Sequence, residues 1–236
     1  MKLLVIPIVL LFMIFSCTKN KEHNTNAYFL AEKFTDSLNI GEIGKTKVEI
    51  ENFRNNLTED NLIVLKFFKK YSFWDYNKRK SVENIWRETS RFYFDKDGVS
   101  GIDAEISDFN NDGYKDFLYV SGIAARGGNV IKTLFIYDSK NKAFVHIKNS
   151  DKYPNLSFNS KLKCINSIIL TGSVTTHFLR LKQDSLIEFA RVDVSDKILV
   201  EERDSSGQFK IIEERKLKRN DDDFYSGYSN YKPLEK

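Results

Sequence analysis

The sequence predicts a mainly β fold: a single antiparallel β-sandwich or open barrel with few short helices. From Lys47 onward, short apolar runs recur between turn residues at the spacing expected of an antiparallel β domain. The connections between these runs are rich in Asp, Ser, Asn and Gly, as tight hairpins require. Residues 186–194 alternate between a mostly apolar face and a polar face that carries Arg191 and Asp193, so one side should face a core.

Strands are expected in both halves of the domain, and the second half is the clearer one. The first half should form strands at residues 47–53, 91–94, 104–106 and 117–120. Residues 62–68 fit a strand by composition, but Thr58 could also cap a helix there. Residues 95–98, reading DKDG, are typical of a hairpin turn. The second half should form strands at 130–137, 143–148, 163–170, 176–182, 186–194, 198–203 and 208–216.

The first residues are typical of an export signal, with Lys2 followed by an apolar run over residues 3–15. This run is shorter than the roughly 20 residues that a membrane-spanning helix needs. The ending Ile-Phe-Ser-Cys resembles the lipobox of bacterial lipoproteins. That resemblance implies cleavage after residue 16, lipidation of Cys17 and, because Thr18 follows, an outer-membrane destination in the cell envelope.

The organisation that we expect has four parts. Residues 1–16 are the signal, and residues 17–45 are a lipidated, mostly polar tether with one weak helix-like turn at 27–38. Residues 46–218 form the β-rich domain, and residues 219–236 form an acidic and aromatic tail that docks or frays. Lipidation of Cys17 would leave Cys164 without a disulfide partner in the chain, so packing must hold the domain together.

Several function classes lack a signal in this sequence. The net charge of +4 comes from interspersed charges of both signs, without the basic stripe of a nucleic-acid-binding protein. Gly44, Lys45 and Thr46 match the end of a phosphate-binding loop, but Asn39 stands where its first glycine belongs, which argues against nucleotide binding. GxSxG and HExxH motifs are missing, so we assign no catalytic residue and expect a protein that is not an enzyme.

The most informative motif is DFNNDGYKDF, at residues 108–117. Calcium takes six to eight oxygen ligands, and alternate acidic or amide residues followed by a glycine turn can fold such oxygens around one point. The sequence therefore predicts one structural calcium ion. Its expected ligands are Asp108, Asn110, Asp112, the carbonyl of Tyr114, and Asp116. The alternative is an Asn-Asp-Gly turn that binds no metal.

The twelfth position of this motif is Tyr119, where an EF-hand has a bidentate Glu, so the motif is not an EF-hand. Its DxNxDGxxD form, followed by the strand-like residues 117–120, resembles the loops of FG-GAP and VCBS repeats. Such repeats build propellers from several blades, each with its own loop. A second copy and an internal period are both missing, which favours a single sandwich or open barrel.

The order of further signatures resembles that of a known family. After the motif come the glycine-containing residues 121–129, then LFIYDSKNKAFV, YPNLSFN and LIEFARV. Residues 104–217 thereby resemble bacterial envelope lipoproteins with a single VCBS-like calcium loop, similar to periplasmic lysozyme inhibitors. The resemblance implies an inhibitor of a peptidoglycan hydrolase, or an immunity protein against one. A surface glycan-binding lipoprotein is the alternative, and a cell-wall hydrolase is the third possibility.

Residues 121–129 suggest where a partner would bind. They should form a hairpin tip next to the calcium loop, with Arg126, Gly127 and Gly128 exposed. A lysozyme-type cleft holds a pair of carboxylates, which an inserted arginine could meet with charge-assisted hydrogen bonds. We expect calcium to hold this tip in shape and so to lower the ordering cost of binding. The alternative is an ordinary exposed arginine on a flexible loop.

Overall fold

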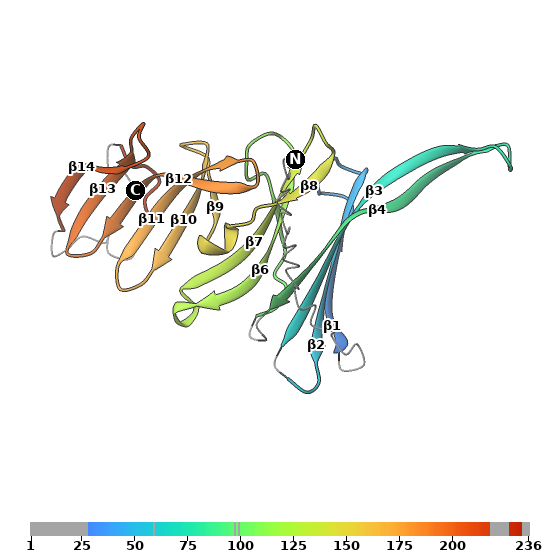
Figure 1. The fold of residues 1–236 in the computed structure, drawn as a ribbon, viewed down its shortest axis with the longest axis horizontal. Coiled ribbons are helices and arrows are strands. Elements are labelled where there is room, and N and C mark those ends of the chain that lie inside the picture. The colour runs from blue at the N-terminus through green and yellow to red at the C-terminus, as the bar shows by residue number, and fades with distance from the viewer. Residues whose placement is uncertain (1–27, 59, 97, 99, 218–226, 233–236) are drawn as a thin grey trace, which may run out of the picture.

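The computed structural model describes residues 28–232, apart from 59, 97, 99 and 218–226. It confirms the predicted mainly β, antiparallel fold. The described strands form three open sheets that stack as layers of a sandwich (Figure 1). Every named pairing joins strands that are consecutive in the chain, so each sheet is a meander. Two short 3-10 turns, η2 (Ala125–Gly127) and η3 (Ser150–Lys152), lie between strands.

The three sheets follow one another along the chain. The N-terminal sheet contains β1 (Tyr28–Asp36), β2 (Thr46–Asn55), β3 (Asn61–Asp75) and β4 (Lys80–Lys96). The central sheet contains β5 (Glu105–Ser107), β6 (Asp116–Ala124), β7 (Asn129–Asp138) and β8 (Ala143–His146). The C-terminal sheet contains β9 (Ser157–Asn159), β10 (Cys164–Leu170), β11 (Val174–Lys182), β12 (Ser185–Val194), β13 (Lys197–Arg203) and β14 (Phe209–Lys216).

The central sheet is covered on both faces, which explains the unbroken apolar runs of β6 and β7. Side chains alternate across a strand, so neighbouring residues enter different cores. Phe117 and Phe135 pack towards the N-terminal sheet, where they meet Phe67. Leu118 and Leu134 belong to the core shared with the C-terminal sheet. A strand buried on both faces gains from being apolar at every position, because each position removes apolar surface from water.

The weak helix-like turn expected at 27–38 is wrong, because strand β1 occupies residues 28–36. β1 pairs with β2 and packs Phe34 against Phe117, with ring centroids 6.3 Å apart. The carboxylate of Glu32 also accepts the backbone N–H of Ile102 at 2.9 Å. These non-local contacts outweigh a weak local preference. Strand β1 therefore lies inside the segment that the sequence predicted as a tether.

Two other expectations about the first half are settled by pairing. Residues 62–68 belong to strand β3 and not to a helix. The DKDG stretch does not connect a hairpin, since β4 pairs with β3 in the N-terminal sheet whereas the next strand, β5, pairs with β6 in the central sheet. The chain passes here from the N-terminal sheet to the central sheet. Local sequence cannot distinguish such a connection between sheets from a hairpin turn.

The N-terminal sheet carries a projecting two-stranded extension, which we call the arm (residues 71–85). Pairing of β2 with β3 ends at Lys69, whereas β3 and β4 continue together from Tyr71 opposite Ile85 to Asp75 opposite Lys80. Figure 1 shows this ribbon extending well beyond the stacked sheets. A two-stranded ribbon on its own is marginally stable. Its attachment to the sheet at the base is therefore what supports it.

Candidate functional site

The predicted calcium loop lies where the layers of the protein meet. It connects the end of β5 to Asp116, the first residue of β6. Lys115 forms an isolated bridge with Gly41 of the β1–β2 connection, and its carbonyl accepts the Gly41 N–H at 2.8 Å. The ring of Tyr114 lies against that of Tyr137 on β7, with centroids 5.4 Å apart. The loop thus joins the N-terminal sheet to the central sheet.

Three of the predicted ligand side chains point into the same short turn of the chain. The two carboxylate oxygens of Asp108 accept the backbone N–H groups of Asp112 and Gly113, at 3.1 and 2.9 Å. Asn110 Oδ1 also accepts the Asp112 N–H at 3.1 Å, and Asp112 Oδ1 accepts that of Tyr114 at 2.9 Å. Gly113 has φ +91°, a left-handed conformation that glycine adopts readily. The side-chain oxygens of these three residues therefore lie close together, but they accept hydrogen bonds from backbone N–H groups of the loop.

Asp116 has a different environment from the other predicted ligands. Its side chain is fully buried, with one oxygen accepting the N–H of Phe109 at 2.7 Å and the other that of Tyr137 at 2.9 Å. Burial raises the pKa of this carboxyl to about 7, and the nearby charges of Asp112 and Asp108 raise it too, against the two backbone hydrogen bonds. Asp116 therefore holds the loop to β7.

The fit of these residues to calcium is partial. The oxygens of Asp108, Asn110 and Asp112 are of the kind that calcium prefers, and they converge. Both oxygens of Asp116 are engaged by backbone amides. Over the described part of the chain, no three His, Cys, Asp or Glu side chains are grouped in a way that could hold a metal. Calcium binding would thus require the loop side chains to exchange backbone hydrogen bonds for the ion.

The predicted partner tip does not lie next to this loop, contrary to expectation. The loop precedes β6, whereas residues 125–128 follow β6, so the two lie at opposite ends of that strand (Figure 1). A strand of nine residues spans about 30 Å. A calcium ion bound in the loop would therefore have no direct contact through which to shape the tip. Sequence proximity suggested adjacency, but an extended strand separates its two ends by its full length.

A different set of contacts holds the tip. Asn155 accepts the Val130 N–H at 3.1 Å and donates to the carbonyls of Gly128 and Ile168, at 2.9 and 2.8 Å. Asn129 exchanges two hydrogen bonds with the backbone of Leu170 at 3.0 and 2.9 Å. These two amides clamp the β6–β7 hairpin to β10 of the C-terminal sheet. The clamp leaves the end of the hairpin facing solvent.

Within that end, Arg126 and Gly127 are exposed, and Gly128 is partly buried. Arg126 itself has φ +55° and Gly127 has φ +96°. A left-handed conformation at a non-glycine residue is uncommon, so the surrounding hairpin must impose it. The guanidinium of Arg126 is thereby presented from a supported turn.

Two hollows flank the loop at residues 108–116. One, of about 320 Å³, is lined by Asn110, Asp112, Tyr137 and residues of the β7–β8 turn. The other, of about 350 Å³, is lined by Phe109, Asn110, Cys164 and Arg180. Burial raises the pKa of the Cys164 thiol to about 11, so it is protonated at neutral pH and a poor nucleophile.

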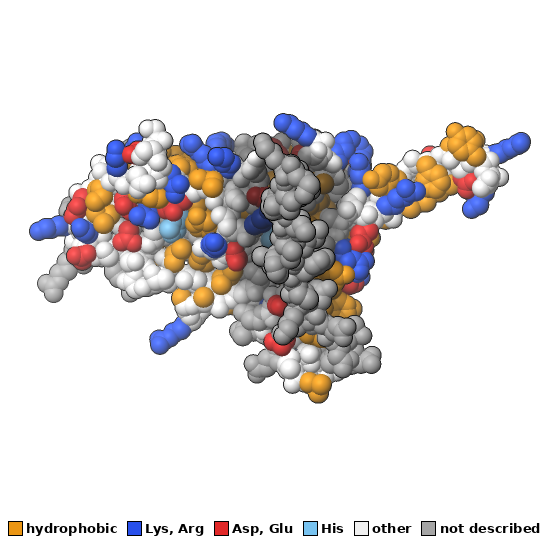
Figure 2. All heavy atoms as spheres, viewed as in Figure 1, with side chains coloured by type: hydrophobic (Ala, Val, Ile, Leu, Met, Phe, Trp, Pro, Cys, Tyr) orange, Lys and Arg blue, Asp and Glu red, His pale blue; other side chains and the backbone are white. Residues whose placement is uncertain are grey.

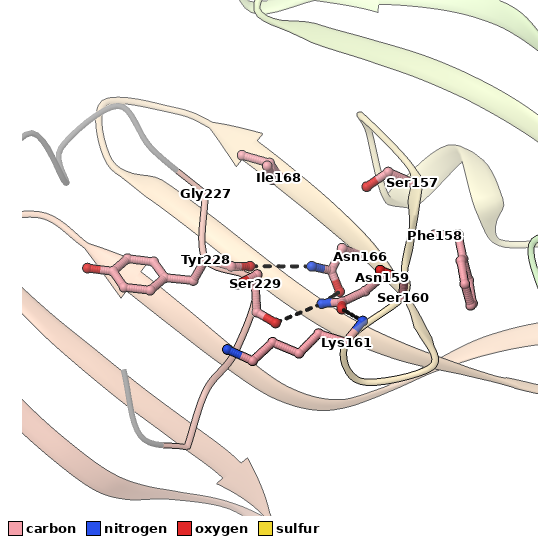
Figure 3. A pocket seen from close by; sticks show the side chains of 10 residues that line it. All are labelled: Ser157, Phe158, Asn159, Ser160, Lys161, Asn166, Ile168, Gly227, Tyr228 and Ser229. Carbon is pink, nitrogen blue, oxygen red and sulfur yellow. Dashed lines mark hydrogen bonds between the residues drawn. The ribbon is translucent and has the colours of Figure 1, made fainter. Parts of the chain in front are cut away.

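A third hollow, of about 390 Å³, lies where residues 227–229 cross the C-terminal sheet. Figure 3 shows Asn159 and Asn166 pointing at this segment. Asn166 donates to the Tyr228 carbonyl at 3.3 Å, and Asn159 donates to that of Ser229 at 3.0 Å. Tyr228 is buried in the outer core of this sheet. The described part of the predicted tail is therefore docked on the domain.

The predicted lipidation residue, Cys17, and the predicted signal lie outside the described residues. Within the described ones, no helix is long and apolar enough to cross a membrane. The arm is the feature that sequence reasoning missed, although aromatic residues of high strand preference occur in its first strand. An alternating pattern did not reveal it, because aromatic side chains occupy both of its faces.

Comparisons with known proteins give little for this chain. No protein-family model matches it, and no curated protein is significantly similar to it. Among solved structures, the chain is similar to one described as "Structure of a Xanthomonas Type IV Secretion System related protein". The TM-score is 0.46 at 14% identity, covering 78% of this chain and 97% of that chain. A likeness this distant carries no argument about function.

Proposed function

We propose that this chain is a lipid-anchored protein of the bacterial outer membrane that acts by binding a partner and not by catalysis. The partner that we propose is a peptidoglycan hydrolase, which the protein would inhibit or against which it would serve as an immunity protein. The resemblance of residues 104–217 to lysozyme-inhibitor-like lipoproteins is the source of this proposal. Its structural support is the tip of the β6–β7 hairpin.

The observation that carries the proposal is that Arg126 is exposed at the end of a hairpin whose base is held by hydrogen bonds. Asn129 and Asn155 fix the base of the hairpin through five hydrogen bonds to backbone groups. A side chain on a pre-ordered turn loses less conformational entropy when it binds. A guanidinium can meet a carboxylate through two parallel N–H···O bonds, and a glycosidase cleft contains two carboxyl groups. The tip therefore suits an acidic cleft.

The experiment is inhibition of a purified lysozyme-type hydrolase by the wild-type protein and by the Arg126→Ala variant. A hydrogen bond to a charged group contributes about 1.5–3 kcal/mol, so we expect the inhibition constant to rise by roughly 10- to 150-fold. Arg203→Ala, an exposed arginine on the C-terminal sheet, serves as the matched control and should leave inhibition unchanged. Equal inhibition by Arg126→Ala and wild type would reject the role of the tip. Glycan binding without any complex would favour the glycan-binding alternative.

We further propose that one calcium ion binds at residues 108–116, with oxygens from Asp108, Asn110, Asp112 and Tyr114. Asp116 would keep the loop attached to β7 through its two backbone hydrogen bonds. Bound calcium would supply the positive charge that offsets the neighbouring carboxylates. Because the loop joins two sheets, ordering it should stabilise the folded state as a whole.

Thermal unfolding in calcium and in excess chelator tests this site. An ion that binds only the folded state at 100 times its Kd adds about 2.7 kcal/mol of stability, so calcium should raise the midpoint. Asp112→Asn should abolish most of that rise. Asp204→Asn, in the exposed turn between β13 and β14, should retain it, because Asp204 lies in another sheet and accepts hydrogen bonds within its own turn. Identical midpoints of the wild type with and without calcium would reject the calcium site, and the loop would then be a turn that binds no metal.

A further inference from the structure

We propose that the end of the arm docks on an anionic lipid bilayer. The arm projects away from the stacked sheets, so its end can reach a flat surface without a clash from the body (Figure 1). Figure 2 shows apolar side chains along it and basic side chains at its far end. The proposal is independent of the hydrolase partner and of calcium.

Aromatic exposure increases towards the end of the arm. Near the base, one cation lies over part of the aromatic surface: Arg87 is 5.4 Å from the ring centroids of both Tyr71 and Phe73. Further out, Trp74 is 52% exposed and Tyr76 is 84% exposed. Aromatic exposure therefore rises from 37% at Tyr71 and 41% at Phe73 to its highest value at the far end of the arm. An end-on surface of this kind fits a plane better than a groove.

The chemistry of the exposed rings fits the boundary between lipid and water. Trp and Tyr combine a large apolar body with one polar group, and they are enriched at the level of lipid headgroups. The chain contains two tryptophans, Trp74 and Trp86, on the outer and basal parts of the same ribbon. Trp86 lies at the base, where Lys70 is 4.8 Å from its ring centroid. Trp74 is thus the indole available at the end.

The charge next to these rings is complementary to anionic lipid. Lys78, Arg79 and Lys80 are consecutive and exposed at the turn. The nearby Asp75 shapes the turn by accepting the backbone N–H groups of Asn77 and Lys78, both at 3.0 Å, and its second oxygen lies 3.8 Å from Lys78 Nζ. Each Lys or Arg close to an anionic membrane surface contributes about 1 kcal/mol of attraction. Rings that enter the interface and cations that meet the headgroups would act together.

Binding is tested with the chain from residue 18, which lacks the predicted lipidation cysteine and keeps every described strand. Vesicles of phosphatidylcholine mixed with phosphatidylglycerol are compared with vesicles of phosphatidylcholine alone. In Trp86→Phe, the remaining Trp74 should shift its emission to the blue and be quenched by brominated lipid. In Trp74→Phe, the remaining Trp86 should respond far less. Both variants should unfold at the wild-type temperature, since neither ring is in a core cluster.

Reversing the charge of the turn tests the lipid preference. The triple variant Lys78→Glu, Arg79→Glu, Lys80→Glu should bind anionic vesicles on the order of a hundredfold more weakly or worse, because three contributions of about fivefold are lost. Equal binding to both kinds of vesicle, or equal quenching of the two tryptophans, would overturn the proposal. A Trp74 that responds to polyglutamate but not to anionic vesicles would overturn it as well, and would assign the arm to an acidic protein.

Discussion

The carboxylate of Asp116 accepts the backbone N–H of Tyr137 at 2.9 Å, which ties the first residue of β6 to the end of β7. Its second oxygen accepts the N–H of Phe109 at 2.7 Å, inside the loop that was predicted to bind calcium. A residue predicted as a ligand is therefore the buried connection between that loop and the central sheet. It would serve this role with or without a metal ion.

Asp116→Ala should strongly destabilise the fold, because it leaves two buried backbone N–H groups without acceptors. An unsatisfied buried donor costs about 1–3 kcal/mol, so we expect a loss of about 2–5 kcal/mol in the free energy of unfolding by urea. Asp138→Ala is the matched control, since Asp138 also accepts two backbone N–H groups but sits in an exposed turn. It should cost less than about 1 kcal/mol. Equal losses from both variants would contradict the assigned role.

Gly41 allows the β1–β2 connection to approach the loop closely, and Gly41→Ala should disturb this contact. Gly41 has φ +54°, and an added Cβ would lie 2.7 Å from Thr46 Oγ1 and 3.0 Å from the rings of Phe144 and Tyr137. Gly44 has φ +72° with no atom within 4 Å of an added Cβ. Both substitutions strain the backbone, but only the first also overpacks. We expect the free energy of unfolding of Gly41→Ala, measured with urea, to be about 1–3 kcal/mol lower than that of Gly44→Ala.

Asn155→Ala should loosen the β6–β7 hairpin, since it removes the hydrogen bonds to Gly128, Val130 and Ile168. We expect a loss of about 2–4 kcal/mol and faster hydrogen exchange at the Val130 amide. Asn141→Ala, in the exposed turn after β7, should change exchange only locally, because both the backbone and the side chain of Asn141 donate to Asp138 within that turn. Unchanged protection of Val130 in Asn155→Ala would show that the clamp does not order the tip.

His146 should make the protein less stable in mild acid. Its ring stacks on Phe135 with centroids 5.0 Å apart, and burial lowers its pKa in the folded state below the usual 6.5. As the pH falls through 6.5 towards the lower folded value, the unfolded chain takes up the proton first, so stability decreases. The measurement is the difference in the free energy of unfolding between wild type and His146→Gln. This difference, wild type minus variant, should decrease as the pH falls over this range. A difference that does not vary with pH would contradict the prediction.

The sequence predicted the C-terminal sheet well because that sheet is built from local information. Its strands follow one another through tight turns such as residues 182–185 and 204–207, and each pairs with its chain neighbour. The alternation of apolar and polar residues over 186–194 directly indicates that one face of the strand is buried. The same reasoning failed at β1, whose order comes from Phe34 and Glu32 meeting residues of other strands. It also missed the arm, where no core face imposes a period.

The sequence by itself determined the mainly β class, most strand positions and the acidic turn at residues 108–116, because strand period and turn chemistry are properties of short segments. Only the tertiary structure decided that the central sheet is buried on both faces, that Asp116 is a buried connection, and that the acidic loop and Arg126 lie at opposite ends of β6. Those facts depend on which segments cover one another, and a repeating side-chain pattern does not specify what lies across from it.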